Sequence, residues 1–273
     1  TEIYTLSLHD ALPIYIQLED DMQRETFAVV PDFKLSEKLT NREMKNVLVT
    51  GATGFLGSHI VKNLLDNTEA KVYCLVRGSS QAEARERFYK VFKFYFNTQY
   101  CEDRIEIING DITMEDLGVG SEMSYKLGRT IDNIIHTAAL VKYYGDYKEF
   151  ETINIAGVRN VMIFAKKYDI KLNHISTIGI SGSYLVRNNI NSKELTEKDL
   201  YVGQNYTENA YVKTKFLAEN MLLNEISNGL KLTIFRMGNL TGRYSDGYFQ
   251  KNAKDNAFRS EEHTSELQSR PHI

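Results

Sequence analysis

Short apolar runs alternate with longer, periodically apolar stretches through the middle of the chain. The short runs are rich in Val, Ile and Leu and are bounded by turn residues, as is typical of strands buried on both faces. They predict strands over residues 46–50, 71–76, 104–110, 133–138, 172–177 and 232–237. The longer stretches have helical spacing and predict helices over residues 55–66, 81–96, 146–168 and 208–227.

Alternation of strands and helices predicts a parallel sheet with right-handed crossovers. The expected fold class is α/β, a Rossmann-like doubly wound sheet that binds its ligand across the carboxyl ends of the strands. We expect this domain to span residues 45–240. Residues 241–258 would begin a substrate-binding region, and we expect the rest of that C-terminal subdomain to be truncated.

Both ends of the chain differ in pattern from the middle. Residues 1–14 and 259–273 contain TLSLHDALPI and RSEEHTSELQS, which are similar to translated short-read sequencing adapters. We expect these tails to be artefacts of sequence assembly that carry no part of the fold. Residues 15–44 are polar and irregular and predict a linker.

Composition narrows the classes of function. The chain is 42% hydrophobic and 25% charged, which is ordinary for a globular protein, and its net charge of -3 does not suit a nucleic-acid binder. No apolar run reaches the roughly 20 residues that span a bilayer. Two cysteines do not make a disulfide framework. We therefore expect a cytoplasmic protein with no nucleic-acid partner, no membrane and no metal site.

A glycine-rich loop, TGATGFLG, follows the first predicted strand and opens the first predicted helix. Gly51 permits a tight turn, Gly54 lets the backbone approach a pyrophosphate, and Gly57 allows close packing of helix and strand. The N–H groups of the helix N-terminus then face the phosphates. The predicted cofactor contacts in this loop are Gly51, Thr53, Gly54, Phe55, Leu56 and Gly57.

Arg77 ends the second predicted strand, where an acidic residue would favour NAD. A guanidinium suits the 2′-phosphate of NADP instead, so we predict NADP (NADPH) as the cofactor. Arg87, on the following helix, is a candidate second clamp. The alternatives are a solvated strand end for Arg77 and a solvated helix face for Arg87.

Two further strand ends are expected to line the cofactor. Asp111 and Ile112 close the third strand, where the carboxylate can accept from the adenine amino group, although an Asp there also suits a turn. Ala138 follows the fourth strand and is small enough to let the cofactor pass close to the backbone. We interpret His136, just before it, as a packed rather than a catalytic side chain.

Tyr211 and Lys215 are four residues apart on one predicted helix and so share a face. The ammonium of Lys215 would favour the phenolate of Tyr211 and so lower the pKa of Tyr211. The protonated Tyr211 would act as general acid on a carbonyl oxygen. Lys215 would also hold the ribose hydroxyls, so both residues are predicted cofactor contacts. Thr177 would donate to the same oxygen. Ser176 as the active hydroxyl, or simple strand-end packing of Thr177, remain alternatives.

Several motifs together resemble the extended short-chain dehydrogenase/reductases, and more closely the terminal thioester reductase domains of nonribosomal peptide synthetases and carboxylic acid reductases. The resemblance covers nearly all of residues 45–258. It is carried by VLVTGATGFLGSHIV (47–61), YCLVRG (73–78), NGDIT (109–113), HTAALV (136–141), NIAGVRNV (154–161), HISTIGISG (174–182), AYVKTK (210–215) and FRMGNLTGRYSDGYFQKN (235–252).

This resemblance implies an NADPH-dependent reductase that acts on a thioester held by the phosphopantetheine arm of a carrier domain. The product would be an aldehyde, and a second round of reduction would give an alcohol. Three alternatives remain at this point: a nucleotide-sugar epimerase or dehydratase with the same cofactor loop, a fatty acyl-CoA reductase, and a non-catalytic NADP-binding module.

Overall fold

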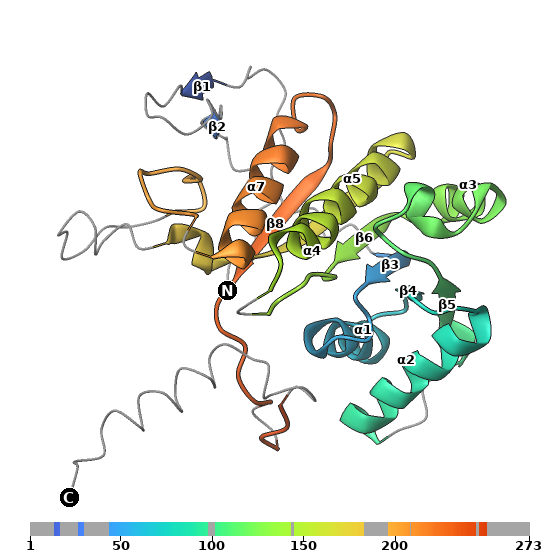
Figure 1. Cartoon of the computed structure of the whole chain (residues 1–273). Coiled ribbons are helices and arrows are strands. Elements are labelled where there is room, and N and C mark those ends of the chain that lie inside the picture. The colour runs from blue at the N-terminus through green and yellow to red at the C-terminus, as the bar shows by residue number, and fades with distance from the viewer. Residues whose placement is uncertain are drawn as a thin grey trace, which may run out of the picture.

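A computed structural model of the chain describes residues 14–16, 27–29, 44–97, 102–142, 145–182, 196–207, 209–243 and 246–249. Six strands form one sheet in the order β5-β4-β3-β6-β7-β8, and every neighbouring pair is parallel (Figure 1). The strands are β3 (Asn46–Thr50), β4 (Lys71–Val76), β5 (Ile105–Asn109), β6 (Asn133–His136), β7 (Lys171–Thr177) and β8 (Leu232–Met237). The predicted Rossmann-like, doubly wound fold is confirmed.

Helices cover both faces of this sheet (Figure 1). Helices α1 (Phe55–Asn67) and α2 (Gln81–Phe96) pack on one face. Helices α3 (Ser121–Thr130), α5 (Gly157–Lys167) and α7 (Ala210–Asn224) pack on the other. The shorter elements are η1 (Glu102–Arg104), η2 (Glu115–Gly118), α4 (Tyr147–Glu151), η3 (Thr152–Ala156) and η4 (Ile178–Ser181).

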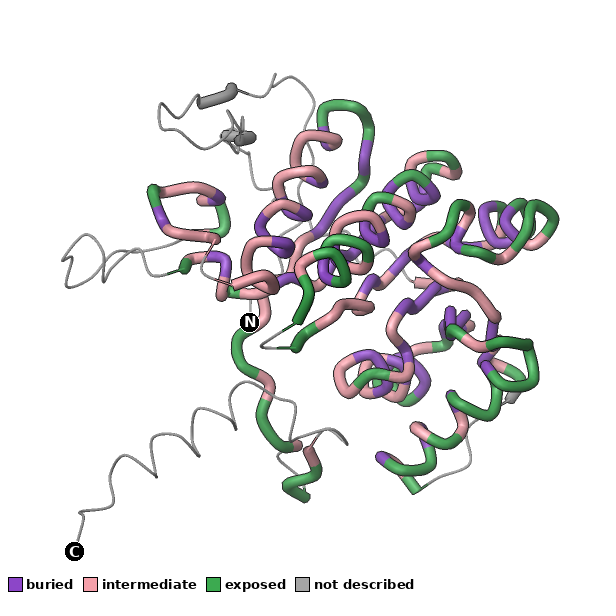
Figure 2. The backbone as a smooth tube through the Cα atoms, in the orientation of Figure 1, coloured by how far each residue is buried: buried purple, intermediate pink, exposed green. Residues whose placement is uncertain are grey.

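Alternate residues along each strand enter two different cores, because side chains in a strand point to opposite faces. In β3, Val47 and Val49 pack with α1 and α2, whereas Leu48 packs with α5 and α7. All three are fully buried, and Figure 2 shows the burial continuing along the neighbouring strands. Burying one such side chain contributes about 1.5–3 kcal/mol. This double burial explains why the strands are continuous apolar runs in the sequence.

Strand order reverses between β3 and β6, because β4 and β5 lie on one side of β3 while β7 and β8 lie beyond β6. In open α/β sheets such a reversal opens a crevice outside the carboxyl ends of the strands, and ligands bind there. The loops after β3, β6 and β7 therefore border the crevice.

The structure departs from the predicted elements in three places. Helix α3 has no counterpart in the prediction, because its ten residues are mostly polar and only Leu127 is a fully buried large apolar side chain. The helix predicted over 146–168 is α4, a π-helical turn (η3) and α5 in succession. Strands β1 (Ile14–Ile16) and β2 (Phe27–Val29) form a separate antiparallel pair where a tail and linker are predicted.

Candidate active site

The glycine loop joins β3 to α1 and packs against the loop after β6. Gly51 has a φ of +72°, and a Cβ there would lie 2.6 Å from the backbone nitrogen of Ala138. A Cβ on Gly57 would lie 2.2 Å from the carbonyl oxygen of Gly51. The Thr137 hydroxyl donates to the Thr50 carbonyl over 2.7 Å and fixes the two loops together. Space therefore requires both glycines, and the positive φ of Gly51 adds a conformational requirement there.

The N-terminus of α1 suits a phosphate. Its N-cap is Gly54, which provides no side-chain cap, and its first turn contains no acidic residue. An uncapped helix start combines free N–H donors with the positive end of the helix dipole. Thr53, Phe55 and Leu56 flank Gly54 and are each partly exposed. The fingerprint residues thus form a cradle that a dinucleotide pyrophosphate fits.

Arg77 and Arg87 meet at the end of β4. The Arg87 guanidinium donates to the Arg77 carbonyl over 3.0 Å. The Arg77 guanidinium is 63% exposed and lies 3.8 Å from the Asp111 carboxylate, a weak contact that leaves it open to a ligand. Two cations beside the glycine cradle suit an additional phosphate.

Asp111 and Ile112 are also engaged within the protein. The Asp111 carboxylate accepts from the backbone nitrogen and the hydroxyl of Thr113, which is the turn arrangement considered as its alternative role. The Ile112 side chain is buried and packs closely against Gly157. A Cβ on Gly157 would lie only 2.8 Å from the Ile112 Cδ1 atom. Contact of Asp111 and Ile112 with adenine stays a prediction.

Thr177, Tyr211 and Lys215 converge where β7 meets α7. The side chains of Thr177 and Tyr211 interact, and the Lys215 ammonium donates to the Ile175 carbonyl over 2.7 Å. Lys215 is only 3% exposed. Ser176, the alternative hydroxyl, points into the buried layer, and its oxygen has no hydrogen-bond partner. The geometry favours Thr177 as the hydroxyl beside Tyr211.

The acid–base properties of this group differ from the expected tuning. Burial raises the pKa of Tyr211, and the interaction with Thr177 opposes it only in part. Burial lowers the pKa of Lys215 to about 8, while the negative charge of Glu219 raises it. The expected lowering of the Tyr211 pKa by Lys215 is therefore not found, because burial raises this pKa instead. A raised pKa keeps the phenol protonated, as a proton donor requires.

A row of polar side chains crosses the sheet beneath the crevice. Thr50, His136 and His174 are in register on β3, β6 and β7, and all are buried. Thr50 Oγ1 and His136 Nδ1 are 2.7 Å apart, and the two imidazole rings stack with centroids 5.4 Å apart. Burial lowers the pKa of His136 to about 3 and that of His174 well below its usual range. His136 is thus a packed, neutral histidine, as interpreted from the sequence.

Two buried polar residues, Asn154 and Glu219, and the largely buried Arg236 were not singled out from the sequence. Asn154, on η3, donates to Thr214 on α7 over 3.1 Å and bonds both backbone groups of Leu140. Glu219 is fully buried and pairs with Arg236 on β8. Each is a charged or amide side chain within an otherwise apolar stretch of the sequence. Such a side chain requires a buried partner, and this pattern could have identified them.

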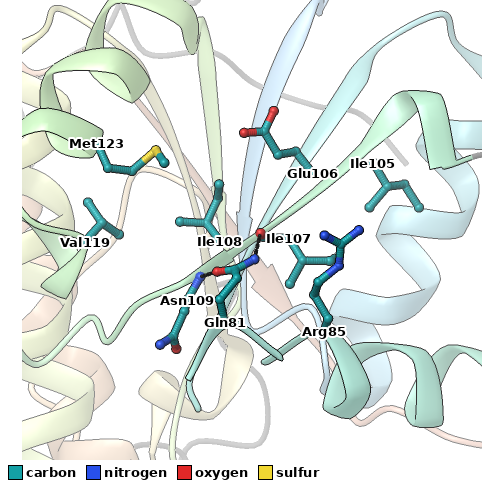
Figure 3. Close-up of a pocket in the computed structure, with 9 residues that line it drawn as sticks. All are labelled: Gln81, Arg85, Ile105, Glu106, Ile107, Ile108, Asn109, Val119 and Met123. Carbon is teal, nitrogen blue, oxygen red and sulfur yellow. Dashed lines mark hydrogen bonds between the residues drawn. The ribbon is translucent and has the colours of Figure 1, made fainter. Parts of the chain in front are cut away.

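A hollow of about 350 Å³ lies along the edge strand β5, lined by residues from both faces of the sheet (Figure 3). The Gln81 carboxamide crosses it, donating to the Ile107 carbonyl over 2.6 Å and accepting from the Asn109 nitrogen over 2.9 Å. This hollow contains none of the predicted site residues. It is lined by Gln81, Arg85, Ile105, Glu106, Ile107, Ile108, Asn109, Val119 and Met123.

Membrane spans and metal clusters are both absent from the part of the chain that the structure describes. None of the helices formed by the described residues is both long and apolar enough to cross a bilayer. Among the same residues, no three His, Cys, Asp or Glu side chains are grouped so that they could hold a metal ion.

Comparison with known proteins supports the fold and the class of site. The chain is 30% identical over 211 residues to a linear gramicidin synthase of Brevibacillus parabrevis, a match that covers 77% of this chain and 4% of that protein. It is 41% identical to a solved thiolation-reductase di-domain from an archaeal non-ribosomal peptide synthetase, with a TM-score of 0.70. It is 30% identical to the terminal R domain of the myxalamid PKS-NRPS pathway, with a TM-score of 0.63.

The share of each solved structure that is matched shows how much of these domains the chain spans. The two structural matches cover 80% and 74% of this chain but only 46% and 51% of the solved chains, so the chain spans about half of them. The family profile described as male sterility protein, an NAD-binding family, matches residues 49–260. The chain therefore belongs to the male sterility protein family of NAD-binding domains, within the extended short-chain dehydrogenase/reductases.

Proposed function

We propose that the chain is the cofactor-binding part of an NADPH-dependent reductase that releases a carrier-bound acyl or peptidyl thioester as an aldehyde. The observation that carries the proposal is the convergence of Thr177, Tyr211 and Lys215 beside the glycine cradle. The reductase domains of peptide synthetases among the similar solved structures support the choice of a carrier-bound thioester as substrate. They disfavour the epimerase alternative.

Binding of the cofactor is assigned to the two ends of the crevice. The N-terminus of α1 and the Gly51–Gly57 loop would hold the pyrophosphate. Arg77 and Arg87 would hold the 2′-phosphate, and Asp111 and Ile112 the adenine. Ala138 would border the ribose, whose hydroxyls Lys215 would bind. When bound, NADPH supplies the hydride.

The protein groups act on the thioester carbonyl. Thr177 donates a hydrogen bond to the carbonyl oxygen, and Tyr211 delivers a proton to it as the carbon is reduced. The hemithioacetal then collapses: its C–S bond breaks, the hydroxyl proton passes to the departing sulfur, and the aldehyde leaves the carrier thiol. A second round of reduction would give an alcohol.

The partner in this proposal is a carrier domain whose phosphopantetheine arm enters the crevice. The archaeal structure is a thiolation-reductase di-domain, which supports such an arrangement. The position of Thr177 at the carboxyl end of β7, beside α7, supports access for a long arm.

Cofactor preference is the first test, measured by fluorescence titration of NADPH and NADH in the full-length protein. We expect NADPH to bind more tightly, by about 1.5–3 kcal/mol for charge-assisted hydrogen bonds to the additional phosphate, or roughly 10–150-fold. Arg77→Asp should abolish that preference. Arg85→Asp, an exposed arginine on the same helix as Arg87, is the matched control and should keep it.

The product is then identified with an acyl-phosphopantetheinyl carrier as substrate. NADPH-dependent appearance of an aldehyde or alcohol, with release of free carrier thiol, is the expected result. Equal affinity for NADH, or no turnover of the thioester by a protein that binds NADPH, would contradict the proposal.

A further inference from the structure

A buried ion pair joins α7 to β8 directly behind the catalytic group. Glu219 is fully buried and the Arg236 side chain is 16% exposed. Two guanidinium nitrogens of Arg236, Nε and Nη2, donate to Glu219 Oε2 over 3.1 and 2.9 Å. The remaining Nη1 donates to the Thr196 carbonyl over 3.3 Å. Both charges are therefore held in one fixed geometry.

Glu219 follows Lys215 by one helical turn, so the two side chains leave α7 on the same face. Lys215 is itself buried, and its ammonium donates to a neutral group, the carbonyl of Ile175. An ammonium out of water is costly without a nearby negative charge. The charge of Glu219 raises the pKa of Lys215 against the effect of burial.

The other ionisable groups around Lys215 come from each neighbouring element. His136 on β6 and His174 on β7 are buried and neutral, and the positive charge of Lys215 contributes to that neutrality. Tyr211, on α7, is protonated because burial raises its pKa. Arg236 on β8 is cationic and faces Glu219. Within this set, Glu219 is the anion.

We propose that Glu219 and Arg236 are positioning residues for the active site: Glu219 supplies the counter-charge that keeps Lys215 in its ammonium form, and Arg236 fixes the Glu219 carboxylate in place. The proposal rests on the proposed function, in which Lys215 binds the ribose hydroxyls. A purely structural tie between α7 and β8 is the competing explanation. It predicts lower stability with no change in the pH at which Lys215 acts.

The test measures NADPH affinity against pH by fluorescence in the full-length protein, together with single-turnover thioester reduction. In the wild type, affinity should fall as pH rises through about 8, because burial lowers the pKa of Lys215 to about 8. Glu219→Gln removes the counter-charge, so the midpoint of this fall should move down by about one pH unit or more. Glu219→Asp keeps the charge and should restore a midpoint close to that of the wild type.

Two further variants separate charge from folding. Glu225→Gln removes a half-exposed carboxylate that pairs with Lys166 just after α7, and it should leave the midpoint unchanged. The double variant Glu219→Met, Arg236→Met removes both partners of the ion pair and leaves neither Glu219 nor Arg236 unpaired, so it should fold even if Glu219→Gln does not. Its midpoint should lie below that of the wild type but above that of Glu219→Gln, which leaves the Arg236 cation without its partner.

A wild-type midpoint in the double variant, or a lowered midpoint in Glu219→Asp, would overturn the positioning role. A shifted midpoint in a protein that does not reduce thioesters would instead remove the proposed function and leave the link between Glu219 and Lys215 standing. Failure of the wild type to bind NADPH would overturn both.

Discussion

The two sides of the crevice are built by different means. On the side of β3 and α1, the backbone makes the site: Gly51 and Gly57 leave room for close approach, and Gly54 leaves the helix end uncapped. On the side of β7, β8 and α7, buried side chains make it, with Lys215 and Glu219 removed from solvent. The first side depends on the absence of a Cβ atom at its glycines. The second side depends on buried charges that need partners of opposite charge.

This difference predicts opposite sensitivities to mutation. A close-packed backbone loop resists any added atom, because interiors have little free volume. A buried polar group resists loss of a single functional atom, because the groups left behind lose their partners. Substitutions on both sides test this contrast, in decreasing order of expected effect.

Tyr211→Phe removes one oxygen from the side built of side chains and should have the largest effect. Loss of the proton donor should lower kcat for thioester reduction by about 10²–10⁴-fold. NADPH affinity, measured by fluorescence, should fall far less than the rate.

The matched control is Tyr206→Phe, since that ring stacks on Phe216 with centroids 4.2 Å apart and the stacking survives the change. Thr177→Val and Ser176→Ala extend the test, and only the first should slow the reaction strongly. If Ser176→Ala lowered kcat strongly and Thr177→Val did not, the active hydroxyl would be that of Ser176.

Gly57→Ala adds one carbon to the side built of backbone. The new Cβ would lie 2.2 Å from the Gly51 carbonyl, so the loop must move. Overpacking of this kind costs about 1–3 kcal/mol, or roughly 5–150-fold in NADPH affinity by titration calorimetry. Asn63→Ala, exposed on the same helix, should bind normally. Unchanged affinity in Gly57→Ala would mean that the cradle is looser than its geometry implies.

The stacked histidines should make stability depend on acid. Their pKa values are lowered in the folded state, to about 3 for His136, so the unfolded chain binds more protons below about 6.5. The free energy of unfolding should therefore fall with decreasing pH, approaching about 1.4 kcal/mol per pH unit for each histidine.

Urea unfolding between pH 7 and pH 5 measures this slope. His174→Gln retains a polar side chain that does not titrate, so the slope should be about half that of the wild type. Parallel curves for the two proteins would show that His174 is not held neutral by the fold.

The fold could be predicted from the sequence because both faces of the sheet are buried. Strands such as Lys71–Val76 are then uninterrupted apolar runs, and the glycine loop marks where the first strand ends. Helix α3 could not be predicted, because Leu127 alone gives too weak a periodicity. The break in the helix over 146–168 arises from tertiary packing, where Asn154 bonds Leu140 and Thr214.

The convergence of the candidate residues Thr177, Tyr211 and Lys215 could be predicted from the sequence, but their electrostatics could not. Spacing placed Tyr211 and Lys215 on one face and ordered them after Thr177. Burial is a property of the assembled layers, so the raised pKa of Tyr211 was not accessible from local pattern. Glu219 and Arg236 lie 17 residues apart, and only the adjacency of α7 and β8 pairs them.

Gln81 has a consequence for how the edge of the sheet meets other chains. An edge strand such as β5 offers unpaired N–H and C=O groups to any passing strand, and chains that accept one another in this way aggregate. The Gln81 carboxamide already occupies the Ile107 carbonyl and the Asn109 nitrogen. At that point these two backbone groups of β5 are not available to pair with an incoming strand. One side chain therefore disfavours edge-to-edge association with another chain.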